Sequence, residues 1–191
     1  MEIQSLIYIT GFMGAGKSTI GSILANALGW EFFDLDRLIE SKRQKTINNI
    51  FKEEGEKKFR EIETEMLIEI SKKKLSIVSL GGGAIASEKN LKILKSTGTI
   101  VYLASSLESV YARLRFKRDR PILKLDETGE IISKENFVEK VKELFESRKP
   151  FYEQADIKID TDSASVGQTV DRLVRTIERQ NQKQKNEKSK N

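Results

Sequence analysis

The chain contains no cysteine and no histidine among its 191 residues. Without cysteine it can form neither a disulfide nor a thiolate metal site, which excludes a secreted disulfide scaffold. Without histidine it has no Ser-His-Asp triad, no Cys-His pair and no imidazole zinc site. Acid–base chemistry must therefore come from Asp, Glu, Lys or Tyr, and any bound metal should be a hard, oxygen-binding ion such as Mg²⁺.

Long apolar runs are also missing, because no stretch approaches the ~18 uninterrupted apolar residues of a membrane span. The first residues run directly into a strand-like segment, without the basic region or the small-residue cleavage site of a signal peptide. We therefore expect a cytoplasmic protein without membrane contact. Its length suits one compact domain and is too short for two ordinary ones.

The net charge of +5 would suggest a nucleic-acid partner if it were spread over the whole chain. It is concentrated instead in residues 179–191, which carry five basic side chains against one carboxylate. The remaining body is nearly neutral, so we expect no nucleic-acid partner. Because this basic tail is polar throughout, we expect it to be disordered.

Apolar runs alternate with helical patterns along the chain. Buried strands are predicted at 5–10, 31–34, 76–80, 99–103 and 156–160. Amphipathic helices are predicted at 17–28, 36–42, 56–73, 87–95, around 107–114, around 137–145 and at 166–177. Such alternation predicts right-handed βαβ units, hence an α/β three-layer sandwich around a five-stranded parallel sheet. Ligands bind at the carboxyl ends of the strands in sheets of this kind.

Residues 11–18 (GFMGAGKS) match the phosphate-binding pattern G-x-x-x-x-G-K-[ST] between a predicted strand and a predicted helix. The glycines allow backbone N–H groups to surround phosphate oxygens, and the helix N-terminus adds its positive dipole end. Lys17 would reach the β- and γ-phosphates, and the Ser18 hydroxyl would ligate Mg²⁺. The pattern indicates nucleoside triphosphate binding but does not separate kinases from ATPases or GTPases.

Other polar residues allow two interpretations each. Asp34 and Asp36 at a strand end can hold a metal's water shell and accept a proton, or can simply cap a helix. Gly81–Gly83 can admit a close ligand or form a flexible turn. Arg60, beside the apolar Phe59, is an ordinary solvated arginine if it is considered alone. The same holds for two further arginines, Arg120 and Arg148.

Taken together, these segments resemble the shikimate kinase family over about residues 6–177. The matching stretches are GFMGAGKSTIG at 11–21, FFDLDRLIE at 32–40, GEKKFREIE at 55–63, SLGGGA at 79–84, VYL at 101–103, RPIL at 120–123 and R-x-P-x-Y at 148–152. The resemblance implies a P-loop kinase fold of the nucleoside-monophosphate-kinase type. It also implies transfer of the ATP γ-phosphoryl group to the 3-hydroxyl of shikimate, in aromatic amino acid biosynthesis.

On the nucleotide side, the resemblance assigns ATP binding to the phosphate loop, to Arg113 as an adenine-stacking residue and to Arg120 from a mobile lid near 117–133. The loop residues concerned are Gly14, Ala15, Gly16, Lys17, Ser18 and Thr19. Ser18 and, through water, Asp34 would hold Mg²⁺. Catalysis would rest on Lys17, Asp36 and Arg120, with Arg120 meeting the transferred phosphoryl group.

On the acceptor side, the resemblance implies that Asp36 binds the shikimate hydroxyls and is the candidate base. Arg60 and Arg148 would hold the shikimate carboxylate, because guanidinium forks suit a planar carboxylate. Gly82 would present its backbone N–H to the substrate. The chain departs from the family in a longer segment between Arg120 and Arg148 and in lacking a proline within 161–169.

We therefore expect a single domain, residues 1–178, followed by a basic disordered tail at 179–191, and a monomer acting on small molecules. A gluconate kinase of the same superfamily is the nearest alternative, because its acid substrate would also require arginines. A binding module without turnover, or one that uses its tail on RNA, is the alternative from another class. The intact Lys17, Ser18, Asp34, Asp36 and Arg120 argue against lost turnover.

Overall fold

The computed structural model describes residues 6–114 and 134–188. Five parallel strands form one sheet in the order β2-β3-β1-β4-β5. Their bounds are Leu6–Thr10 for β1, Glu31–Asp34 for β2, Ser76–Ser79 for β3, Thr99–Ala104 for β4 and Ile157–Asp160 for β5. The predicted α/β fold with a five-stranded parallel sheet is confirmed. The expected lid near 117–133, with Arg120, lies outside the described residues.

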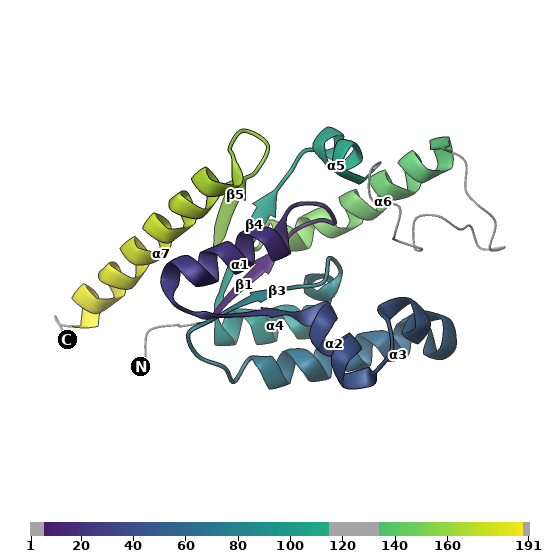
Figure 1. The fold of residues 1–191 in the computed structure, drawn as a ribbon, viewed down its shortest axis with the longest axis horizontal. Coiled ribbons are helices and arrows are strands. Elements are labelled where there is room, and N and C mark those ends of the chain that lie inside the picture. The colour runs from purple at the N-terminus through teal and green to yellow at the C-terminus, as the bar shows by residue number, and fades with distance from the viewer. Residues whose placement is uncertain (1–5, 115–133, 189–191) are drawn as a thin grey trace.

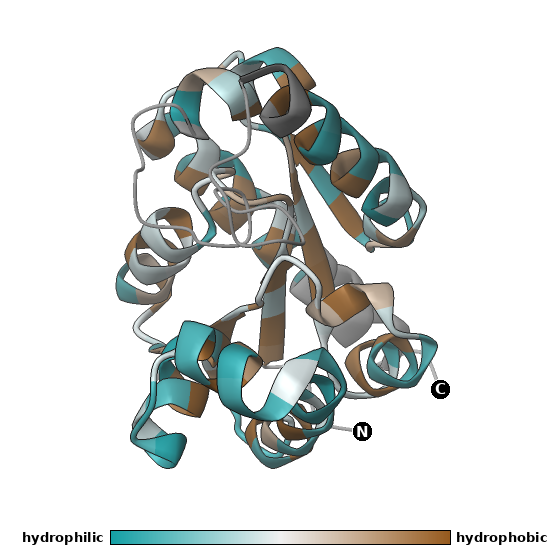
Figure 2. Cartoon of the chain, turned by 90° about the vertical axis from the view of Figure 1, so that its right-hand side faces the viewer, coloured by the Kyte–Doolittle hydropathy of each residue, from teal (hydrophilic) through white to brown (hydrophobic). Residues whose placement is uncertain are grey.

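Helices cover both faces of this sheet (Figures 1 and 2). One face packs against α1 and α7, and the other packs against α3, α4 and α6, with α2 against α3. The bounds are Lys17–Leu28 for α1, Leu35–Arg43 for α2, Ile47–Ile70 for α3, Glu88–Thr97 for α4, Leu107–Leu114 for α5, Lys134–Tyr152 for α6 and Val166–Lys188 for α7. A 3₁₀ turn, η1, spans Ala84–Ala86.

The central strand β1 is buried on both faces of the sheet, which requires a nearly continuous apolar sequence. All five of its residues are buried. Because neighbouring side chains of a strand point to opposite faces, Leu6 and Tyr8 join the core under α3, α4 and α6, whereas Ile7 and Ile9 join the core under α1. Burial on both faces fixes the strand from which the phosphate loop leaves the sheet.

The structure departs from expectation at the C-terminal end. Residues 179–188, predicted to be disordered, continue α7 as helix to Lys188. This segment is rich in Gln and Lys, with three of each, and both have high helix propensity. Once the buried Val170, Leu173 and Ile177 have packed the first turns, extension adds one hydrogen bond per residue without a new nucleation cost. Helix propensity therefore accounts for the helical course of residues 179–188. Among the helices of the described residues, none is long and apolar enough to cross a membrane.

Candidate functional site

The loop between β1 and α1 follows the phosphate-binding pattern in geometry as well as in sequence. Its last glycine, Gly16, is the N-cap of α1 and has left-handed φ and ψ angles of 88° and 13°. A glycine adopts this conformation without strain and has no side chain to bond the first amides of the helix. These amides, at the positive end of the helix dipole, are therefore suited to an anion.

Lys17 lies over this loop. Its Nζ donates to the carbonyl oxygens of Gly11 at 2.9 Å and Phe12 at 3.1 Å. Lys17 is half-buried, and its ammonium group is held against the backbone of the loop. One side-chain cation is thus placed at the loop, as the sequence pattern predicts.

Three oxygen-bearing side chains meet at the carboxyl ends of β2 and β3, next to α1. Ser18 Oγ donates to Asp34 Oδ2 at 2.6 Å and lies 3.5 Å from Ser79 Oγ. Asp34 also caps α2, where its Oδ1 accepts from the Arg37 N–H at 3.3 Å. The helix-capping interpretation of this aspartate is therefore confirmed, while its other oxygen faces Ser18 and its role at a metal stays a prediction.

The three glycines Gly81–Gly83, between β3 and η1, lie where neighbouring polar side chains come very close to the backbone. None of the three has a left-handed φ angle. A Cβ added at Gly81 would lie 2.7 Å from Asp36 Oδ1, and one at Gly83 would lie 2.8 Å from Arg60 Nη2. At Gly82 it would lie 3.4 Å from Arg148 Nη1. The triplet therefore lets Asp36 and Arg60 approach the backbone closely, and it also forms a turn in which the Ala84 N–H donates to the Gly81 carbonyl at 3.1 Å.

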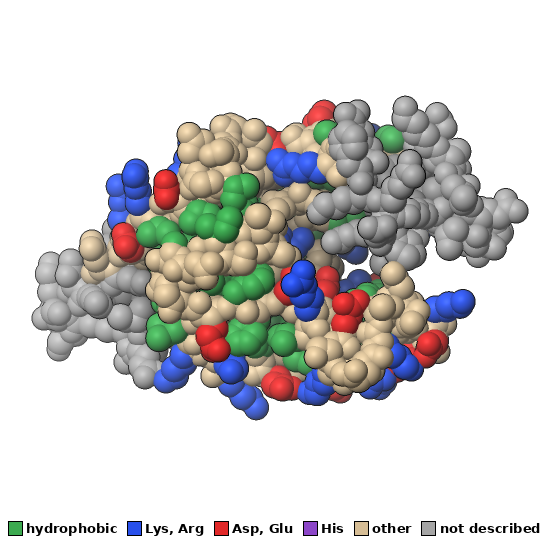
Figure 3. Space-filling model, viewed as in Figure 1, with side chains coloured by type: hydrophobic (Ala, Val, Ile, Leu, Met, Phe, Trp, Pro, Cys, Tyr) green, Lys and Arg blue, Asp and Glu red, His purple; other side chains and the backbone are tan. Residues whose placement is uncertain are grey.

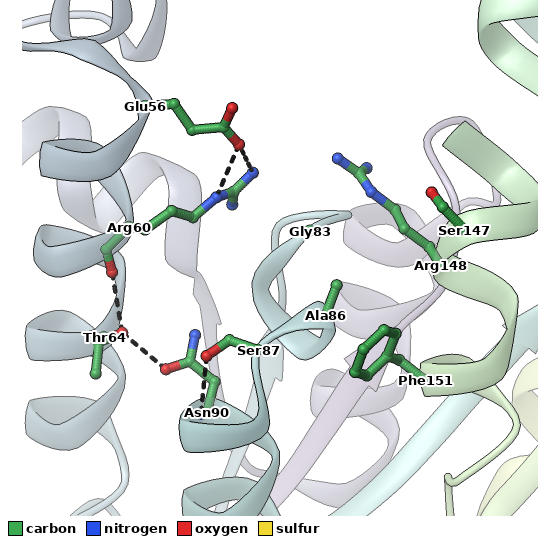
Figure 4. Close-up of a pocket in the computed structure, with 10 residues that line it drawn as sticks. All are labelled: Glu56, Arg60, Thr64, Gly83, Ala86, Ser87, Asn90, Ser147, Arg148 and Phe151. Atoms are coloured by element: carbon green, nitrogen blue, oxygen red, sulfur yellow. Dashed lines mark hydrogen bonds and ion pairs between the residues drawn. The ribbon is translucent and has the colours of Figure 1, made fainter. Parts of the chain in front are cut away.

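These three side chains come from separate helices. Asp36 lies in the first turn of α2, Arg60 in the second half of α3 and Arg148 near the end of α6. Figure 4 shows the guanidinium groups of Arg60 and Arg148 on opposite sides of Gly83. The structure therefore gathers the predicted acceptor-side residues around one turn, beside the phosphate loop, since Gly82 also lies close to the Met13 N–H.

Arg60 forms ion pairs with two carboxylates. Its Nη1 donates to Glu63 Oε2 at 2.9 Å, and its Nε and Nη2 both donate to Glu56 Oε1 at 3.3 and 3.0 Å. Burial raises the pKa of Glu63, and the Arg60 charge offsets only part of this rise. Burial alone would lower the pKa of Arg60, but the two carboxylates outweigh it and raise that pKa, so Arg60 stays charged. Arg60 is therefore ion-paired and only 31% exposed, and its substrate-binding role stays a prediction.

A cavity of about 500 Å³ opens between α3, α4 and α6 (Figure 4). Both arginines line it. The residues around it are Glu56, Arg60, Thr64, Gly83, Ala86, Ser87, Asn90, Ser147, Arg148 and Phe151. Its floor is fixed by a buried chain of hydrogen bonds, in which Thr64 Oγ1 bonds the Arg60 carbonyl and Asn90 Oδ1, and Asn90 Nδ2 donates to the Ala84 carbonyl.

Tyr152 is a supporting residue that the sequence reasoning did not single out. It is fully buried, stacks on Tyr102 with ring centroids 5.2 Å apart, and donates its hydroxyl to the Gly82 carbonyl. Burial raises the pKa of this hydroxyl far above its ordinary value, so the group remains a donor. The R-x-P-x-Y stretch at 148–152 was the available signal, because it places Tyr152 one helical turn after Arg148.

We expect Tyr152→Phe to lower the free energy of unfolding by about 1–3 kcal/mol, because it leaves the Gly82 carbonyl without its buried partner. Urea denaturation measures this change. Tyr111→Phe is the matched control, since the half-buried Tyr111 likewise donates its hydroxyl to a backbone carbonyl, that of Val138. Equal losses in the two variants would contradict a special role for Tyr152.

Arg113, at the end of α5, is held beside the phosphate loop. Its Nη1 donates to Ser105 Oγ at 2.8 Å and to the Gly14 carbonyl at 3.4 Å, and its Nη2 donates to Asp162 Oδ1 at 3.2 Å. Its partner Asp162 follows β5, within the segment that lacks the expected proline. The guanidinium is therefore near the loop, where the resemblance places the nucleotide. Thr19 is exposed in the first turn of α1, and Arg120 lies outside the described residues.

Comparison with known proteins yields one consistent family. The family model for shikimate kinase matches residues 13–178. The shikimate kinase of Chlorobaculum parvum is 48% identical over 179 residues, which cover 94% of this chain and 95% of that protein. That of Chlorobaculum tepidum is 45% identical, again over 179 residues, with coverages of 94% and 93%.

Similarity to solved structures points to the same family. A shikimate kinase from Acinetobacter baumannii in complex with shikimate has a TM-score of 0.81 at 36% identity, and the match covers 91% of this chain and 92% of that one. A gluconokinase from Sinorhizobium meliloti has a TM-score of 0.58 at 14% identity, with coverages of 98% and 99%, so that likeness extends to the fold alone. Since the family model and these relatives span nearly the whole chain, the protein belongs to the shikimate kinase family, which is a family of ATP-dependent kinases.

Proposed function

We propose that this protein transfers the γ-phosphoryl group of ATP to the 3-hydroxyl of shikimate, giving shikimate 3-phosphate and ADP for aromatic amino acid biosynthesis. The observation that carries the proposal is the convergence of Asp36, Arg60 and Arg148 on Gly81–Gly83 beside the phosphate loop. A carboxylate next to two guanidinium groups suits a substrate with hydroxyls at one end and a carboxylate at the other.

On the nucleotide side, the amides of residues 14–19 would bind phosphate oxygens, and Lys17 would neutralise charge on the transferred group. Arg113 would contact the nucleotide from α5. For Arg120, the role in meeting the phosphoryl group rests on the resemblance alone.

A magnesium site fits the residues present. Ser18 Oγ and Asp34 Oδ2 are hard oxygen donors within 2.6 Å of one another at the phosphate loop. Within residues 6–114 and 134–188, no group of three or more His, Cys, Asp and Glu side chains gathers into a metal cage. That suits Mg²⁺, which usually takes one or two protein ligands and completes its octahedron with water and phosphate oxygens. When bound, the ion would neutralise phosphate charge.

On the acceptor side, Arg60 and Arg148 would hold the carboxylate from two sides, and the Gly82 N–H would bind a substrate oxygen. Asp36 would then contact the 3-hydroxyl and either orient it or accept its proton. Positioning contributes strongly, since the two substrates must be aligned within a near-attack distance.

Two alternatives are less well supported. Gluconate kinase shares the fold, but its solved example matches at only 14% identity. RNA binding by the body of the protein would require a basic face. Among the described residues of the face in Figure 3, Lys and Arg side chains alternate with Asp and Glu, without a large area of one sign.

An assay of ADP release with shikimate and gluconate in parallel tests the proposal. Both acids carry one carboxylate, so recognition by charge alone would accept both of them. We expect release to require shikimate together with Mg²⁺ and to stop when EDTA removes the ion. Equal or faster turnover with gluconate would overturn the assignment.

Gly83→Ala tests the close approach of Arg60 directly. The backbone of Gly83, with a φ angle of −105°, accepts alanine, but the new Cβ would push the guanidinium aside. We expect the KM for shikimate to rise roughly tenfold or more, because small misplacements of binding groups are costly, while the KM for ATP barely changes. Gly167→Ala is the matched control, since a Cβ there meets no atom within 4 Å. A similar KM for shikimate in both variants would contradict the expectation.

A further inference from the structure

The two edges of the Arg60 guanidinium have partners of very different kinds. On one edge, Nη1 pairs with Glu63, whose side chain is 1% exposed. On the other edge, Nε and Nη2 share a single oxygen of Glu56, whose side chain is 67% exposed. The buried partner belongs to the framework of the site, because removing it would leave an uncompensated charge in the interior. The exposed partner is held far less firmly, since water competes for it.

The edge that Glu56 occupies is the one suited to a ligand. The Nε and Nη2 groups form the planar fork that binds both oxygens of a carboxylate. Glu56 uses this fork with one oxygen only, so the fork is incompletely matched. Glu56 also lines the 500 Å³ cavity together with Arg148, which approaches from the opposite side.

The backbone beside Glu56 breaks the helix. Gly55 has φ and ψ angles of 80° and 169° inside α3, so Glu56 begins the second half of a kinked helix. A glycine adopts this conformation without strain, and a Cβ there would meet no atom within 4 Å. Glu56 thus lies in the first turn after the kink, and its side chain is 67% exposed.

We propose that Glu56 is an internal competitor of the substrate: it occupies the Nε/Nη2 fork of Arg60 in the free enzyme and is displaced by the shikimate carboxylate. This inference rests on the proposed function, because it takes shikimate as the incoming acid. Glu56 thereby sets how strongly an acid must bind before it enters the site. Weakly matched anions fail to displace it, whereas an acid that also contacts Arg148 and Asp36 succeeds.

The test compares Glu56→Gln, Glu56→Asp and a matched control, Glu61→Gln. Glu61 lies on the same helix, is exposed and pairs with Lys58, so its neutralisation removes an equal charge without touching Arg60. We expect Glu56→Gln to lower the KM for shikimate roughly two- to fivefold, the range of one exposed ion pair, with kcat and the KM for ATP unchanged. Glu56→Asp keeps the charge but shortens the reach, so it should lower the KM as well. Glu61→Gln should have no effect.

Calorimetric titration of shikimate into the nucleotide-free variants should show the same ratios in Kd. An unchanged or raised KM in Glu56→Gln would mean that Glu56 positions Arg60 and would overturn the inference. An equal fall in Glu61→Gln, or wild-type behaviour of Glu56→Asp, would point to the general field of the charge and would also overturn it. The wild type is assayed in the same series. Failure of the wild type to turn over shikimate would overturn the proposed function itself, whereas normal wild-type turnover with an unresponsive Glu56 overturns only the inference.

Discussion

Replacing Lys17 by alanine should lower kcat by at least ~10²-fold, the cost of losing one preorganised donor to the transition state. The ammonium group bonds the carbonyls of Gly11 and Phe12 and is thus fixed over the amides that would bind phosphate. Without Lys17, the negative charge that develops on the transferred phosphoryl group would no longer be stabilised by the lysine ammonium group. The KM for shikimate should change less than kcat, since the proposed arrangement assigns the shikimate carboxylate to Arg60 and Arg148 and the phosphate charge to Lys17.

Steady-state kinetics with both substrates varied measure this effect. Lys89→Ala, an exposed lysine on α4, is the control for the loss of one positive charge. A thermal melt checks that the loop tolerates the loss of two hydrogen bonds. Near-normal turnover by a folded Lys17→Ala variant would show that the loop is not the catalytic cradle.

Asp36→Asn should lower kcat by roughly 10²- to 10⁴-fold, the range for removal of a positioned general base. Asparagine retains the size of the side chain and an oxygen that can accept a hydrogen bond, but it cannot take up the proton of the 3-hydroxyl. The close contact with Gly81 leaves the new side chain little freedom to find another position.

Glu88→Gln serves as the control, because Glu88 is likewise an acidic residue in the first turn of a helix, α4. It reports the cost of losing a favourable charge at a helix N-terminus, which is small. If kcat of Asp36→Asn falls by less than about tenfold while the KM for shikimate rises, Asp36 orients the hydroxyl without accepting its proton.

The phosphate loop was predictable because its information is local. Its elements are the strand, the glycines, Lys17 and Ser18, which follow one another directly along the chain. Residues that form the sequence pattern are therefore also neighbours in the structure. The acceptor side differs, since Asp36, Arg60 and Arg148 belong to three helices and meet only through the fold. Residue by residue, each had an equally good structural explanation, and the resemblance to a family was needed to join them. Their catalytic and binding roles remain proposals.

The spacing of the acidic residues around Arg60 carries information about its ion pairs. Glu56 and Glu63 lie four residues before and three residues after Arg60, which is the spacing of neighbours on a helix face. That spacing predicts both ion pairs, although not which carboxylate is buried. For Gly81–Gly83, by contrast, sequence cannot separate close approach from a left-handed turn, because both require the absence of a Cβ. The helical course of 179–188 follows from the helix propensity of its residues, which hydrophobic periodicity does not register.

The glycines of the phosphate loop and those of the 81–83 triplet are under two different selective pressures. Gly11, Gly14 and Gly16 have positive φ angles of 145°, 83° and 88°, so a mutation there strains the backbone as well as the loop's chemistry. Gly81 and Gly83 have no left-handed φ angle, and a Cβ at either position would instead press on neighbouring side chains. Once the acceptor changes, substitutions at Gly81 and Gly83 should therefore cost little stability, and hence little cellular abundance. Drift toward a new substrate should begin at this triplet and leave the phosphate loop untouched.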